Sequence, residues 1–431
     1  MSKKILVLAA LQICFAHCVA IAQEAQVAAA APSPDYVVLG WNDLGNQFMM
    51  PDYSKMCILP PYNTLRAQAV KRGNPPQLVT SGVSLTYRFP NNTTSADKIN
   101  FWTYEMGLFG TSHAANMGLT GNGLSGTMTL SGTSFVATAV PITPYEDATP
   151  TTAQYYQTTE VTLAESQAPG AILDQTQFIA PISDELGCGA VGCHNVAGKT
   201  PWERIVEQHN SKFGTSLTFP TLCARCHADS FIGKPGGSAP VFSRAIHNRH
   251  RSHVAADNCT ACHPGTNTQY ERGAMAGSST CVDCHGNLTA MASGTRTPWV
   301  SLPRCTQCHD ADHAENTGVL YRNSVGHSGL YCSACHNSPH AELPSSQPLE
   351  GMQMERLQGS PLNLTKCSVC HLSPPLAPGP HNVITAYLIA QHKLGNVTLA
   401  GANLTRADYN TDGQVNIGDV IKQVNRDLAG N

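Results

Sequence analysis

Seven short segments between residues 188 and 371 each end in a cysteine that is followed directly by a histidine, with a second cysteine a few residues earlier. The first segment, Cys188 to His194, has four residues between its cysteines, and the other six have two. These 184 residues amount to about 26 per segment, which is too few to form a separate hydrophobic core around each. The region must therefore fold around the groups that its cysteines and histidines hold.

The spacing within the segments indicates covalently attached haem. Two thiols can add across the two vinyl groups of one porphyrin, and the next side chain must then be an imidazole that reaches the iron. Zinc is the alternative for paired cysteines, but zinc would not require a histidine directly after every second cysteine. The sequence predicts seven covalent haem c groups. Their attachment residues are Cys188, Cys193, His194, Cys223, Cys226, His227, Cys259, Cys262, His263, Cys281, Cys284, His285, Cys305, Cys308, His309, Cys332, Cys335, His336, Cys367, Cys370 and His371.

The cysteine count agrees with this assignment. Of 17 cysteines, 14 belong to the seven segments, Cys14 and Cys18 lie near the N-terminus, and Cys57 stands alone. No pairs remain for a disulfide framework. We expect Cys57 to be a buried unpaired thiol rather than an intermolecular disulfide.

Histidine numbers allow every haem a second imidazole. Of 18 histidines, seven follow the motif cysteines and His17 lies near the N-terminus, so ten remain for seven distal positions. Two histidine ligands per iron can therefore be supplied throughout. The candidate distal ligands within the motif region are His209, His247, His250, His253, His313, His327, His340 and His381.

Two of these candidates follow a motif histidine at a spacing of four residues. In a continuing helix, His313 would share a face with His309, and His340 would share a face with His336. Two rings on one face cannot approach one iron from opposite sides. His313 and His340 are therefore predicted to bind neighbouring haems.

Three further candidates, His247, His250 and His253, lie together shortly before Cys259. At helical spacing their rings spread over a broad face. This arrangement favours ligation of two or three different irons over a single metal site.

The N-terminal sequence predicts export. Lys3 and Lys4 precede an apolar run that ends in Ala20-Ile21-Ala22, as in a cleavable secretory signal. We expect a secreted protein that works outside the cell or at its surface, with the periplasm as the alternative. No other stretch reaches the length of a membrane span.

Charge is sparse in this chain. Charged residues make up 13% of the sequence, and the formal net charge is −3. Haem propionates would add negative charge, and no basic stripe or basic–aromatic pattern is present. Nucleic acid is therefore excluded as an expected partner.

Composition shifts predict a multidomain protein. A signal peptide covers residues 1–22, and an Ala/Pro-rich linker covers 23–35. An all-β, sandwich-like domain is expected over 36–165, and a heptahaem cytochrome c domain with short helices and mostly coil over 166–385. The remaining segment, 386–431, is predicted to form a small helical EF-hand or dockerin-like calcium module.

Alternating side chains support the β domain. Apolar and polar residues alternate over 83–89 and again over 127–130, as in half-buried strands. Pro90-Asn91-Asn92 and Gly121-Asn122-Gly123 indicate turns.

The C-terminal segment contains a twelve-residue calcium loop that starts at Asp408 and takes its sharp turn at Gly413. Oxygen donors stand at the positions that such loops use. One Ca²⁺ ion is predicted to be bound by Asp408, Asn410, Asp412, Gln414, Asn416 and Asp419. The loop and the helix predicted after it resemble half of a dockerin module, whose second loop is missing here.

The motifs of the central region resemble those of multihaem c-type cytochromes of the extracellular electron-transfer type. The resemblance covers about half of the mature chain. It implies conduction of electrons along closely packed haems, each with two histidine ligands, to extracellular acceptors or partner cytochromes. It also implies that copies of the chain can assemble into filaments.

An enzyme is the alternative. A periplasmic multihaem reductase would need one iron with an open coordination position. Many nitrite reductases have lysine in place of a motif histidine, and no motif here does. The prediction is therefore an electron-transfer protein without catalytic residues.

Overall fold

The computed structural model describes residues 33–373, except 191 and 266, and the isolated positions 392, 398, 408, 413–416, 419 and 422. The predicted signal peptide, nearly all of the linker and most of the C-terminal segment lie outside the described residues. The chain divides into two compact units. Unit 1 comprises Met1–Arg72 and Gln77–Lys366, and unit 2 comprises Gly73–Pro76 and Cys367–Asn431.

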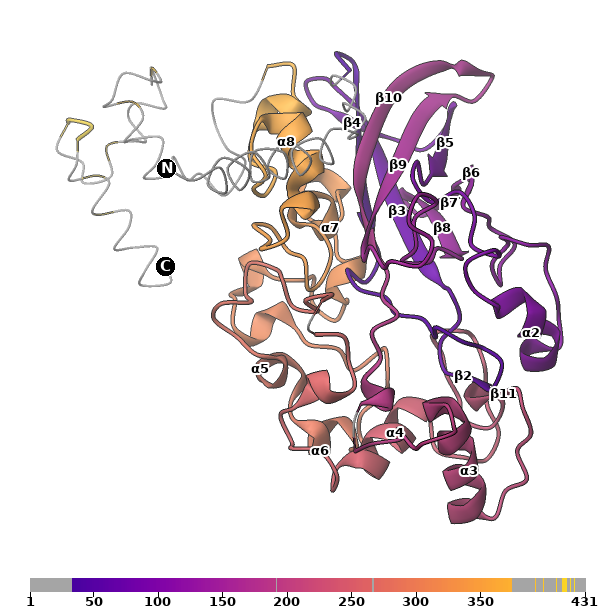
Figure 1. Cartoon of the computed structure of the whole chain (residues 1–431). Helices are drawn as coiled ribbons and strands as arrows, with labels where there is room; N and C mark the ends of the chain where they lie inside the picture. Colours follow the sequence, from indigo (N-terminus) through magenta and orange to yellow (C-terminus); the bar gives the residue numbers. More distant parts are fainter. Residues whose placement is uncertain are drawn as a thin grey trace, which may run out of the picture. The chain divides into compact units, whose positions relative to one another are not determined.

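Strands dominate the first half of the described chain, and short helices joined by coil dominate the second half (Figure 1). The strands are β1 (Tyr36–Asn42), β2 (Met56–Cys57), β3 (Asn63–Lys71), β4 (Gln77–Val79), β5 (Val83–Arg88), β6 (Ser125–Thr127), β7 (Thr129–Ser131), β8 (Ser134–Val140), β9 (Tyr156–Glu165), β10 (Ala168–Pro181) and β11 (Thr221–Leu222). The α-helices are α2 (Phe101–Phe109), α3 (Pro201–Phe213), α4 (Phe242–His250), α5 (Cys281–His285), α6 (Leu288–Met291), α7 (Cys332–His336) and α8 (Met352–Gln358). The 3₁₀ turns are η1 (Gly187–Gly189), η2 (Cys223–Arg225), η3 (Cys259–Ala261), η4 (Cys305–Gln307), η5 (Ala311–His313), η6 (Tyr321–Asn323), η7 (His327–Gly329), η8 (Pro348–Gly351) and η9 (Cys367–Val369).

The strands of residues 36–181, which we call the sheet domain, form two antiparallel sheets. One sheet has the order β1-β3-β8-β7, and β4 pairs with β3 beyond the end of β8. The other has the order β10-β9-β5-β6. β1 packs against β10, and buried side chains from both sheets belong to one hydrophobic cluster. The sheet domain is therefore a two-layer arrangement around a shared core.

Two details of the sheet domain differ from the sequence expectation. The expected strand at 127–130 is interrupted at Met128, whose N–H donates to the Leu85 carbonyl at 2.8 Å. Its two ends join different sheets as β6 and β7, so Leu130 is exposed. The expected domain boundary at residue 165 cuts a hairpin, because β10 pairs with β9 as far as Pro181.

Residues 188–366 of unit 1, which we call the motif region, carry the first six motifs. Within this region the only strand among the described residues is β11, which pairs in parallel with β2 of the sheet domain. α3 begins at a capping box in which Thr200 and Glu203 exchange hydrogen bonds, and a proline occupies its first turn. α4 contains His247 and His250, and His253 follows three residues after its end.

Buried polar side chains join the motif region to the sheet domain. The Gln353 amide accepts from the Gly40 N–H at 2.7 Å and donates to the Gly40 carbonyl at 3.1 Å, as a neighbouring strand would. Ser338 donates to the Asn42 carbonyl at 2.6 Å. The sheet domain and the motif region therefore share buried contacts.

The loop after β1 is shaped for close approach. Gly45 has a φ of +67°, and a Cβ atom there would lie 1.7 Å from the Pro339 carbonyl oxygen. Only glycine fits both conditions. The Gly45 carbonyl accepts a hydrogen bond from Arg272 at 2.7 Å.

Candidate haem-binding sites

Each described motif closes one helical turn. In four motifs a backbone hydrogen bond runs from the histidine N–H to the carbonyl of the first cysteine, at 2.8–3.1 Å. These histidines are His227, His263, His309 and His371. In two others the same residues form α5 and α7. This turn places both thiols and the imidazole within reach of a single group.

The longer first motif reaches a similar closure. The His194 N–H donates to the Cys188 carbonyl at 3.4 Å, and Cys193 donates to Ala190 at 3.1 Å. These two hydrogen bonds keep His194 close to the backbone of Cys188. Residue 191 lies outside the described part of this motif.

Four motif histidines face a second histidine that is distant in the sequence. In each pair the ring centroids lie between 6.0 and 6.3 Å apart. The pairs are His194–His250 at 6.2 Å, His227–His209 at 6.3 Å, His263–His247 at 6.1 Å and His285–His340 at 6.0 Å.

This separation is the one expected of two ligands on opposite sides of one iron. With metal–nitrogen bonds of about 2 Å, and each ring centroid roughly 1.2 Å behind its ligating nitrogen, the centroids would lie about 6.4 Å apart. Direct ring stacking would bring the centroids closer, and a hydrogen bond between the rings would need no such regular separation. The residues present therefore fit haem.

Hydrogen bonds at Nδ1 orient several of these rings. The Nδ1 atoms of His227, His247 and His250 lie 2.6–2.7 Å from backbone carbonyls, of which two belong to the preceding turn of α4. His209 Nδ1 lies 3.0 Å from the Thr215 hydroxyl. A proton on Nδ1 leaves Nε2 as the ligating atom, which is the usual arrangement in metal-binding histidines.

Burial keeps the innermost rings neutral. Burial is the main cause that lowers the pKa of His263 to about 4 and the pKa of His340 to about 3, and nearby histidines, together with Arg272 in the case of His340, contribute to these shifts. Imidazole must be neutral to bind a metal. These two rings are therefore in the ligating form at neutral pH.

The motifs of unit 1 lie next to one another. The Gly187 N–H donates to the Cys262 carbonyl at 3.1 Å, which joins the first and third motifs. The Cys259 and Cys281 side chains are also neighbours, since each thiol acts on the other electrostatically. The first motif also neighbours the second, because the Cys188 and Cys223 thiols interact electrostatically.

The row of neighbouring motifs continues beyond the motif of Cys281. Cys284 interacts electrostatically with Cys308, and Tyr321 interacts with both Cys305 and Cys332. The six motifs of unit 1 therefore follow one another in space. Their spatial order differs from the sequence order, because the Cys223 motif precedes the Cys188 motif.

The remaining candidate distal histidines have other positions. His253 is exposed, and His327 is exposed in η7. The side chain of His313 is 76% exposed, with Nδ1 2.7 Å from Asp310. His381 lies outside the described residues. Within the described residues, no ring of a second histidine faces His309 or His336 as in these four pairs.

The helical premise behind the predictions for His313 and His340 was wrong. η4 ends at Gln307, and α7 ends at His336 because Asn337 has a φ of +68°. His340 itself has a φ of +64°. A turn, rather than a continuing helix, directs its ring to His285 of a different motif.

Three residues near the histidine pairs were not predicted from the sequence, because they belong to no recognisable motif. Thr215 anchors His209, and Tyr270 lies beside the rings of both His263 and His340, at centroid distances of 6.0 and 4.8 Å. Arg272 is fully buried, and its guanidinium donates to the Tyr270 carbonyl at 3.5 Å. The sequence around Arg272 contains no motif that would have predicted its buried position.

The described part of the calcium loop adopts a turn suited to a cation. Gly413 has a φ of +83°, and its N–H donates to Asp408 at 2.8 Å. Asp419 accepts from the Asn416 N–H at 2.7 Å, and Asn416 Nδ2 contacts the Gln414 carbonyl at 3.3 Å. Asn410 and Asp412, which complete the predicted set, lie outside the described residues.

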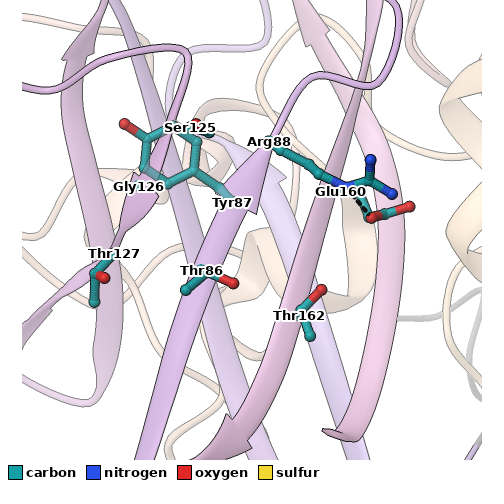
Figure 2. Close-up of a pocket in the computed structure, with 8 residues that line it drawn as sticks. All are labelled: Thr86, Tyr87, Arg88, Ser125, Gly126, Thr127, Glu160 and Thr162. Atoms are coloured by element: carbon teal, nitrogen blue, oxygen red, sulfur yellow. Dashed lines mark hydrogen bonds and ion pairs between the residues drawn. The ribbon is translucent and has the colours of Figure 1, made fainter. Parts of the chain in front are cut away.

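Other features of the described chain are unrelated to these sites. A shallow pocket on the sheet formed by β5, β6 and β9 is lined by Tyr87 and by an Arg88–Glu160 ion pair at 2.5 Å, and its lining contains neither cysteine nor histidine (Figure 2). Across the described residues, no group of three or more His, Cys, Asp or Glu side chains is placed to hold one metal ion. In the same residues, no helix is both long and apolar enough to cross a membrane.

No protein-family model, curated protein or solved structure matches this chain.

Proposed function

We propose that this protein is a secreted heptahaem c-type cytochrome that conducts electrons along neighbouring haems with two histidine ligands each. The observation that carries the proposal is the set of four histidine pairs at 6.0–6.3 Å, each containing one motif histidine. The chain's motif residues would attach the porphyrins, and the paired rings would complete the coordination of four irons. The candidates outside these pairs, which are His253, His313, His327 and His381, would supply the second ligand of the other three.

Full coordination favours electron transfer over catalysis. An iron with two protein ligands has no position for a substrate, and its ligands are the same in both oxidation states. A haem bound in this way supplies a centre that accepts and gives up one electron. The contacts between successive motifs would keep these centres close together.

Redox partners follow from this role. We propose partner cytochromes or extracellular acceptors as the donor and acceptor of electrons, and self-association into filaments as one form of contact between copies. In this proposal the protein works outside the cell or at its surface. Electron microscopy of the purified protein that shows only monomers at all concentrations would refute the filament.

We also propose that unit 2 binds one Ca²⁺ ion through the loop that begins at Asp408. The hydrogen bond from Gly413 to Asp408 supports the loop turn. A calcium titration by calorimetry that shows no binding would refute this assignment.

Spectroscopy of the purified, export-matured protein tests the main proposal. The pyridine haemochrome assay is expected to give seven haems per chain, and the ferric protein to be entirely low-spin. Carbon monoxide added to the reduced protein should leave its spectrum unchanged. Carbon monoxide binding by one haem would instead favour the reductase, and a clearly lower haem content would refute the heptahaem assignment.

A further inference from the structure

The four histidine pairs have two different ring geometries. The imidazole planes cross at 79° in the pair of His194 and His250, and at 88° in the pair of His227 and His209. They are nearly parallel, at 15°, in the other two pairs. Ring separation is almost constant, so only the rotation of the rings distinguishes the two groups.

The two geometries are also grouped in space. The crossed pairs belong to the Cys188 and Cys223 motifs, whose thiols are neighbours. The parallel pairs belong to the Cys259 and Cys281 motifs, whose first cysteine side chains are neighbours. The row of sites therefore contains a crossed block followed by a parallel block.

Thr215 holds one of the crossed pairs. Its hydroxyl lies 3.0 Å from His209 Nδ1 and donates to Asn210 at 2.8 Å, so its orientation is set by the end of α3. The partner ring, His227, is held from a different direction by the Pro240 carbonyl at 2.6 Å. Two anchors on separate segments fix the two planes nearly at right angles.

Tyr270 supports both parallel pairs. Its ring stands edge-on to His263 at 78° and to His340 at 73°, so one side chain contacts a ligand of each site. The Tyr270 carbonyl accepts hydrogen bonds from Asn46 and Arg272, which hold the residue in place. One aromatic side chain therefore borders a histidine ring of each parallel pair.

We propose that Thr215 and Tyr270 are positioning residues that divide the bis-histidine sites into a crossed class and a parallel class. The inference rests on the proposed haem attachment. In a low-spin ferric haem, crossed imidazole planes leave two iron d orbitals nearly equal in energy, whereas parallel planes separate them. The splitting of these iron d orbitals would therefore change between the haem of the Cys188 motif and the haem of the Cys259 motif.

Electron paramagnetic resonance of the oxidised full-length holoprotein distinguishes the classes. Crossed planes give a signal with a very large maximum g value, and parallel planes give a rhombic signal with a smaller one. At least two haem equivalents are expected in each class. A wild-type spectrum with one class only, at full haem content, would overturn the inference while leaving the proposed function intact.

Paired variants test the two positioning residues. Thr215→Val should move one haem equivalent out of the crossed class, whereas Ser216→Ala, at the exposed neighbouring position, should not. Tyr270→Leu should shift up to two equivalents of the rhombic signal, whereas Tyr270→Phe, which keeps the ring, should not. If Thr215→Val gave the same spectrum as Ser216→Ala, and Tyr270→Leu the same spectrum as Tyr270→Phe, neither Thr215 nor Tyr270 would be a positioning residue. Haem content measured on the same samples separates these effects from failed maturation.

Discussion

Arg272 shows how much the motif region depends on single buried residues. Its guanidinium has no exposed surface, pairs with Glu350, donates to the Gly45 carbonyl and lies 5.1 Å from the centre of the Tyr156 ring. A charge in such a position is tolerated only when every hydrogen bond is made. One side chain thus connects the sheet domain to the segment that carries Tyr270.

Replacement of Arg272 by methionine is expected to lower the free energy of unfolding by about 3–5 kcal/mol, because Glu350 would remain buried without its partner. Urea unfolding followed by circular dichroism measures this change. Lys199→Met is the matched control, since its ion pair with Glu207 is exposed and should contribute less than about 1 kcal/mol. Equal effects of the two substitutions would contradict the argument.

At the scale of elements, the contact between η1 and η3 requires a glycine at position 187. A Cβ atom on Gly187 would lie 1.9 Å from the Ala261 carbonyl oxygen. The Gly187 N–H also forms the hydrogen bond to Cys262 that joins the two motifs. Backbone approaches backbone here, so no flexible side chain can move aside.

Gly187→Ala should therefore separate the first and third motifs and destabilise the protein by about 1–3 kcal/mol, as overpacking usually does. The expected result is a lower thermal midpoint and a lower yield of fully haem-loaded protein. Gly277→Ala is the control, because no atom lies within 4 Å of the added carbon. A wild-type midpoint for Gly187→Ala would show that the contact is not needed.

At the scale of the whole molecule, contacts between regions distant in the sequence hold unit 1 together. Lys55 of the sheet domain pairs with Glu203 of α3 at 2.9 Å. The hydrogen bond from Lys55 and those within the capping box lower the pKa of Glu203 from 4.5 to about 2. Because the folded state holds this carboxylate ionised, its stabilising effect is present above about pH 4.5 and is lost as the pH falls towards 2.

Glu203→Gln should flatten the decline of the thermal midpoint between about pH 4.5 and pH 2, since the variant has no proton to bind at this position. Midpoints measured over this range for wild type and variant give the comparison. Glu207→Gln, on the same helix, serves as the control. A decline in the Glu203 variant as steep as in the wild type would show that the pairing has no effect.

The proposed attachment residues and the candidate distal residues differ in how far the sequence could predict their positions. Both thiols and the imidazole of a motif lie within one helical turn, so their spacing alone indicated seven sites. His340 was predicted to serve a neighbouring haem, and its ring lies opposite His285, but the helical reasoning behind that prediction was wrong. The pairing of His209 with His227 could not be predicted, since it depends on where α3 packs.

The sequence by itself indicated which group each motif would hold in the proposed function, because covalent attachment would require only residues that are close together in the chain. The tertiary structure alone decided which histidine faces which motif, in what spatial order the motifs follow and at what angle each pair of rings meets. Those properties depend on contacts such as Thr215 with His209 and Tyr270 with two different pairs. Their physical origin is the packing of segments that chain order does not bring together.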